Sequence, residues 1–155
     1  MISATETDAS SLLHQLFVGA SVYGVRFGAL QLLCYPPSGS GELFINLSSA
    51  FQVFESRPTA FPASESEVPD QSEEEEILSL FALRAWEISQ VEIVEPAGHL
   101  AVTFANGTVL YVNGNNPGPE PWHAGFNAFD RAQSIWVIAI SGGRPIAYEP
   151  FAGER

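Results

Sequence analysis

Few residues of this chain have types and spacing that suggest chemistry. His99, Glu120 and His123 are the only mixed set of metal-ligand types, and their spacing matches no known zinc-site pattern. Cys34 stands beside Leu33 in an apolar run, where cysteine usually acts as a small buried hydrophobe. The sequence therefore predicts neither a metal ion nor a thiol nucleophile.

Motifs for acyl or phosphoryl transfer are missing as well. Ser141-Gly142-Gly143 lacks the preceding glycine of a nucleophile elbow. No glycine-rich loop is followed by a phosphate-binding lysine, because the chain contains no lysine. We expect no cofactor and no enzymatic activity.

The strongest chemical feature is a run of acids without a base. It comprises Glu65, Glu67, Asp70, Glu73, Glu74, Glu75 and Glu76. General acid–base catalysis needs carboxyl groups held in a water-poor cleft, whereas these look solvated. The run is therefore interpreted either as a solvated helix start or as a surface that steers and holds a cationic partner.

The whole chain is acidic, with 18 Asp and Glu residues against 6 Lys and Arg and a formal net charge of −12. Phosphate contacts need clustered cations, so this charge disfavours nucleic acid and anionic membrane and favours a cationic protein partner. A single cysteine excludes an internal disulfide. The N-terminus carries acids where a signal peptide needs cations, and every apolar run is shorter than the ~20 residues of a membrane span. We expect a cytoplasmic location.

An aromatic side chain would complete such an interface, because binding hot spots favour Trp and Tyr. Trp122, which follows Glu120 in a Gly- and Pro-rich stretch, is the candidate anchor, and both residues are assigned to the partner surface. The alternative is that Trp122 is a lid folded over the core. Trp86 and Trp136 lie in apolar strand patterns and are predicted to be core residues.

Apolar spacing and turn residues predict the elements. A helix is expected over residues 9–17 with Asp8 as its N-cap, and another begins at residue 73, where Ser72 and Glu75 form a capping box. Asn106-Gly107 predicts a two-residue hairpin turn with positive φ angles. Strands are expected in residues 21–35 (two), 42–46, 50–54, 86–94, 100–104, 109–112, 135–140 and 146–148.

These elements predict a single α+β domain over residues 1–155, made of two imperfect repeats of a helix followed by antiparallel strands. The repeat-like halves are residues 8–55 and 72–149. A flexible connector rich in proline, serine and acid, residues 56–71, joins them. The alternative is that an α+β protein shows this order by chance.

The second half also resembles a known family. The strands around Asn106-Gly107, the element Glu120-Pro121-Trp122 and the terminal Ser141-Gly142-Gly143 turn are similar to motifs of DUF6188, a domain of unknown function in small bacterial proteins. In its general arrangement the second half also resembles immunity proteins from toxin systems. Here the spacing is Glu-x-Trp where the family has a Glu-x-x-Trp-like element, and the resemblance implies a fold type without catalytic residues.

The sequence therefore predicts a non-enzymatic binding protein. The preferred hypothesis is an immunity-type inhibitor that neutralises a cationic bacterial toxin through an acidic surface. The alternatives are a small-molecule or regulatory binding module with a pocket between the two halves, and a structural or assembly protein.

Overall fold

The structure is a computed structural model that describes residues 6–28, 30–39, 41–95, 97–115, 121–127, 135–138 and 146–148. Within these residues the chain is α+β, as predicted. The elements in chain order are α1 (Glu6–Phe17), β1 (Ser21–Arg26), β2 (Gln31–Tyr35), β3 (Glu42–Leu47), β4 (Phe51–Phe54), the 3-10 turn η1 (Glu65–Glu67), α2 (Glu73–Phe81), β5 (Ile88–Val94), β6 (His99–Phe104), β7 (Val109–Val112), β8 (Trp122–Asn127), β9 (Ile135–Ile138) and β10 (Ile146–Tyr148).

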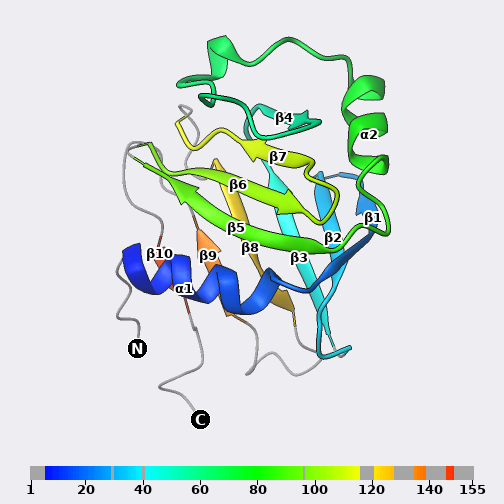
Figure 1. Ribbon diagram of the computed structural model, residues 1–155, viewed down its shortest axis with the longest axis vertical. Coiled ribbons are helices and arrows are strands. Elements are labelled where there is room, and N and C mark those ends of the chain that lie inside the picture. Colours follow the sequence, from blue (N-terminus) through cyan, green and yellow to red (C-terminus); the bar gives the residue numbers. More distant parts are fainter. Residues whose placement is uncertain are drawn as a thin grey trace.

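The strands form two antiparallel sheets that lie one in front of the other (Figure 1). In the described residues, one sheet has six strands in the order β1-β2-β3-β8-β9-β10, and the other has four in the order β4-β7-β6-β5. Helix α1 packs mainly against β5, with further contacts to β8, β9 and β10, and α2 packs against β1 and β4. Each helix therefore contacts strands of both sheets.

The core fills the space between the sheets. Strand β3 shows how the strand period builds it, because Leu43, Ile45 and Leu47 belong to the core cluster while Phe44, between them, does not. Facing them, Val102 of the four-stranded sheet is fully buried. Neither of the helices in the described ranges is long and apolar enough to cross a membrane.

The two halves exchange their fourth strands. In each half a helix is followed by three strands that pair in order, β1-β2-β3 and β5-β6-β7. The next strand then crosses to the other half's sheet, so that β4 pairs with β7 and β8 pairs with β3. The halves are thus equivalent in order and pairing, and they are interleaved in one domain.

Reciprocal hydrogen bonds join the halves where the edge strands β1 and β5 begin. The N–H of Gly19 donates to the carbonyl of Ile88, and the N–H of Ala85 donates to the carbonyl of Val22, both over 2.8 Å. The shift along the sequence that takes Gly19 to Ala85 also takes Val22 to Ile88. Both Gly19 and Ala85 have positive φ, and β1 and β5 have a register irregularity at the corresponding place. The predicted repeat is therefore visible in the backbone.

Two local expectations from the sequence differ from the structure, and one strand was not predicted. Helix α1 begins at Glu6, so Asp8 lies inside its first turn and is not its N-cap. The turn between β6 and β7 has positive φ only at Gly107, and the N–H of Phe104 donates to Thr108 across it, so the loop is wider than two residues. Strand β8, which completes the exchange between the halves, was not expected. The turn predicted at residues 141–145 lies outside the described residues.

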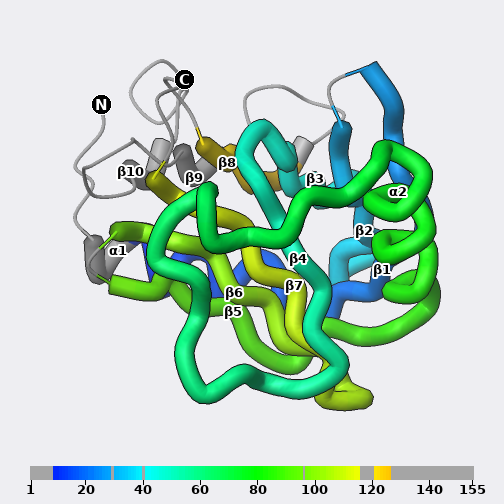
Figure 2. The backbone as a smooth tube through the Cα atoms, turned by 90° about the horizontal axis from the view of Figure 1, so that it is seen from above, coloured from blue at the N-terminus to red at the C-terminus, as the bar shows by residue number. Residues whose placement is uncertain are grey.

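The connector, residues 56–71, makes a long excursion above β4 and β7 (Figure 2). Phe61 stacks on Tyr111 of β7 with ring centroids 5.4 Å apart, and the hydroxyl of Tyr111 donates to the carbonyl of Pro62 over 2.6 Å. Val68 is buried. The connector is thus attached to the four-stranded sheet by Phe61 and Pro62, and by Gln71, whose side chain donates to the carbonyl of Phe51 on β4.

Candidate acidic groove

Helix α2 places two carboxylates of the acidic run on one side. The helix begins where the sequence predicts, because Ser72 accepts the N–H of Glu75 and the Glu75 carboxylate accepts the N–H of Ser72. Acids in this first turn are favoured by the helix dipole. Glu73 and Glu76, three residues apart, share one face of the helix.

The connector adds a third carboxylate from the opposite direction. Glu65, at the start of η1, accepts the N–H of Ala50 over 3.0 Å and the hydroxyl of Ser49 over 3.3 Å, both through Oε2. These bonds attach η1 to the loop between β3 and β4. They hold the Glu65 side chain near Glu73 and Glu76, although Glu65 lies on η1 and the other two lie on α2.

A groove lies between these three carboxylates. Its main cavity has a volume of about 530 Å³, and a neighbouring cavity of about 280 Å³ shares Ala50, Phe51, Glu65 and Glu76 with it. The main cavity is lined by carboxylates, serines and apolar side chains, namely Glu65, Glu73, Glu76, Ser48, Ser49, Phe27, Gly28, Leu30, Leu47, Ala50, Phe51 and Ile77. We call this the acidic groove.

The electrostatics of the acidic groove favour a cation. None of the described residues that line either cavity is basic. Burial, and second the neighbouring charge of Glu73, raise the pKa of Glu76 above its usual value of 4.5. A positive group placed in the groove would offset this electrostatic cost, because it stabilises the ionised carboxylate of Glu76.

The structure brings together only part of the predicted partner surface. Glu65, Glu73 and Glu76 line the main cavity, and Asp70 lines its neighbour. The other three acids of the run line neither cavity: the Glu75 carboxylate is engaged in the capping box, Glu67 accepts the N–H of Ala63, and Glu74 is exposed on α2. Glu120 lies outside the described residues.

The aromatic residues are placed differently from the prediction. Trp122 begins β8 and is fully buried, with its indole N–H bonded to the carbonyl of Gly98. It is therefore not exposed to a partner, and its burial agrees with the alternative of a side chain folded over the core. Trp86 was expected in the core, but it precedes β5 and is 42% exposed. Strand β8 was not predicted because the residues before Trp122 are rich in Gly and Pro, which are typical of loops. Trp86 was wrongly assigned to the next strand because apolar residues follow it. The side chain of Trp136 lies outside the described residues.

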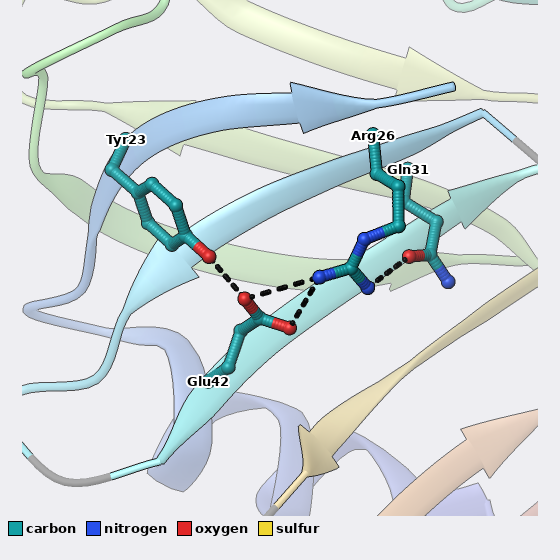
Figure 3. A network of polar contacts seen from close by, with 4 residues as sticks. All are labelled: Tyr23, Arg26, Gln31 and Glu42. Carbon is teal, nitrogen blue, oxygen red and sulfur yellow. Dashed lines mark hydrogen bonds and ion pairs between the residues drawn. The ribbon is translucent and has the colours of Figure 1, made fainter.

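A polar network on the outer side of β1, β2 and β3 provides no free catalytic group (Figure 3). The Glu42 carboxylate accepts the hydroxyl of Tyr23 and the guanidinium of Arg26, which also donates to Gln31. Burial and the bond to Glu42 raise the pKa of Tyr23 to about 12, so its phenol keeps its proton. The network therefore cross-links three neighbouring strands.

The candidate nucleophile Cys34 and the candidate metal ligand His99 are both buried. Cys34 is fully buried, and burial raises its pKa to about 12, so it is a core thiol as predicted. His99 is buried and accepts the N–H of Gly114 at Nδ1 over 2.9 Å. Among the described residues, no three His, Cys, Asp or Glu side chains are grouped so that they could hold a metal ion.

Comparison with known proteins places the chain in no family. No family model matches it, and no curated protein and no solved structure matches it either.

Proposed function

We propose that this chain is a non-enzymatic binding protein, an immunity-type inhibitor that neutralises a cationic toxin through its acidic groove. The observation that carries the proposal is the convergence of Glu65, Glu73 and Glu76, from two separate elements, on one cavity without a basic lining residue. A solvated helix start would account for Glu73 and Glu76 but not for Glu65, which belongs to the connector and lines the same cavity.

The groove has the chemistry to hold arginine or lysine side chains of a partner. Phe27, Leu47 and Ile77 offer apolar walls for the methylene stem, while the carboxylates face the charged head group. The net charge of −12 would accelerate the encounter with a basic protein, and this attraction weakens as salt rises. Inhibition would then follow from occlusion of the basic surface with which a toxin such as a nuclease holds its substrate.

The alternative function is the binding of a small cationic molecule in the same groove. The cavity lies between loops of the first half and α2 of the second, and about 530 Å³ is within the range of small-molecule sites. The groove is open, with much of its lining polar, which favours a side chain of a macromolecule over an enclosed ligand.

The test is neutralisation in living bacteria. The products of the genes that flank this gene are expressed singly, with and without the chain, and we expect one to arrest growth alone and to be neutralised by the chain. A variant with Glu65, Glu73 and Glu76 changed to Gln should associate more slowly with that product in stopped-flow measurements and show a flatter salt dependence. An unchanged rate across the salt series would refute the role of the groove. A variant with Glu55, Glu92 and Glu95 changed to Gln is the charge-matched control, because these three acids line neither cavity.

A further inference from the structure

Helix α2 exposes large apolar side chains on the side that faces away from the core. Leu78 is 61% exposed and Phe81 is 45% exposed, whereas Leu80 of the same helix is fully buried. Leu78 and Phe81 are three residues apart, so they stand next to each other on the helix surface. Figure 1 shows α2 at the periphery of the molecule, beside β1.

Trp86 lies just beyond this helix. It is held by the backbone, because its N–H donates to Leu83 and its carbonyl accepts the N–H of Val22 on β1. The residue is nevertheless 42% exposed. We call Leu78, Phe81 and Trp86 the α2 face.

Charged residues near the α2 face are mostly acidic. Glu74 and Glu75 stand one turn before Leu78, and Glu87 follows Trp86, all three exposed, while Arg84 is the one basic residue between Ser72 and Glu87. An apolar centre with an acidic rim is complementary to a partner whose apolar patch is surrounded by arginine or lysine. A second copy of this chain would bring like charges together and is therefore disfavoured.

We infer that the α2 face is the apolar anchor of an interface with a basic protein, and that it works together with the acidic groove. The inference rests on the proposed function, because it names the part of the surface that slows dissociation once charge has guided the encounter. Trp86 and Phe81 would then be the aromatic anchors of the interface, the role for which the sequence analysis suggested Trp122.

The test uses a defined probe. This is a helical peptide with arginines along one face and leucines along the other, together with a charge-matched peptide in which serines replace the leucines. Titration is followed by tryptophan fluorescence, in which Trp86 should shift to shorter wavelength as it is buried. We expect the leucine peptide to bind about tenfold more tightly than the serine peptide, and Phe81→Ser or Leu78→Ser to remove about that difference.

Matched variants separate the outcomes. Tyr35→Ser changes an aromatic residue that is 58% exposed on β2, and it should leave the affinity unchanged. Equal binding of both peptides by wild type, or an equal loss in Tyr35→Ser, would overturn the inference while leaving the groove as the charge-dependent site. A loss in Phe81→Ser with no effect of Glu73→Gln and Glu76→Gln would instead contradict the groove and support the α2 face. Sedimentation showing a dimer that Phe81→Ser dissociates would overturn the inference, because a second copy would then cover this face.

Discussion

The indole N–H of Trp122 donates to the carbonyl oxygen of Gly98 over 2.9 Å inside the core, and so joins β8 to the turn between β5 and β6. Trp122→Phe should retain most of the packing but leave that carbonyl without its donor, at a cost of about 1–3 kcal/mol. Trp122→Ala should cost more, about 3–5 kcal/mol, because it also opens a cavity. Urea unfolding measures both. A Phe variant as stable as wild type would show that the bond contributes nothing.

The same turn approaches Gly114 so closely that no side chain fits. A Cβ at this position would lie 2.2 Å from the carbonyl oxygen of Gly98. Gly114→Ala should therefore force the two loops apart and destabilise the protein by about 1–3 kcal/mol. Gly24→Ala is the control, since a Cβ there meets nothing within 4 Å. Equal unfolding midpoints for the two variants would contradict the close approach.

The equivalent residues Gly19 and Ala85 should respond in opposite directions to substitution. Both adopt positive φ, 95° and 74°, which costs a non-glycine residue about 1–2 kcal/mol. Ala85→Gly should therefore stabilise the protein by up to about 1 kcal/mol, because glycine relieves the strain but loses more entropy on folding. Gly19→Ala should destabilise it, since its Cβ would also lie 3.3 Å from the Pro37 ring. Thermal unfolding of the pair checks both signs.

Some local signals in the sequence predicted local structure correctly, although the Asp8 cap and the two-residue turn at Asn106-Gly107 were wrong. The capping box of Ser72 and Glu75 marked the start of α2 to the residue, and Cys34 between apolar neighbours was correctly placed in the core. These features depend on residues close to one another along the chain. A single sequence carries enough information to predict them.

The exchange of strands could not be predicted in this way. Whether β4 pairs with β3 or with β7 depends on packing between distant segments, and the pattern of Phe51–Phe54 is the same in both cases. The acidic groove depends on that packing too, because Glu65 reaches it only through its bonds to Ser49 and Ala50. The acids were identified from their types, whereas their division between groove and solvent needed the fold.

Stability should fall on mild acidification because of His99. Burial lowers the pKa of His99 below its ordinary value of 6.5, so the folded state resists protonation while the unfolded state accepts it. The stabilisation is fully present above pH 6.5 and is lost as pH falls from there through the lowered folded pKa. His99→Gln should flatten this part of the pH profile of unfolding free energy. An unchanged slope in His99→Gln would contradict this assignment.

Glu76 should show a conflict between stability and binding. Its folded pKa is raised, so the ionised form costs stability, and the cost is absent below pH 4.5 and grows as pH rises through the raised pKa. Glu76→Gln should therefore stabilise the free protein at pH 7, because the neutral amide avoids the cost of burying a charge and, second, the repulsion from Glu73. The same change should weaken binding of the arginine- and leucine-containing peptide, because the groove loses one of its three carboxylates.

Glu74→Gln is the matched control for Glu76. Glu74 belongs to the same first turn but lines neither cavity, so its substitution removes a favourable dipole interaction without relieving repulsion in the groove. It should destabilise the protein slightly, by about 0.3–1 kcal/mol. Opposite signs for the two variants at pH 7 are expected from chemical denaturation. A stabilising effect of both would show that α2 merely carries too much negative charge, and that the groove imposes no special cost on Glu76.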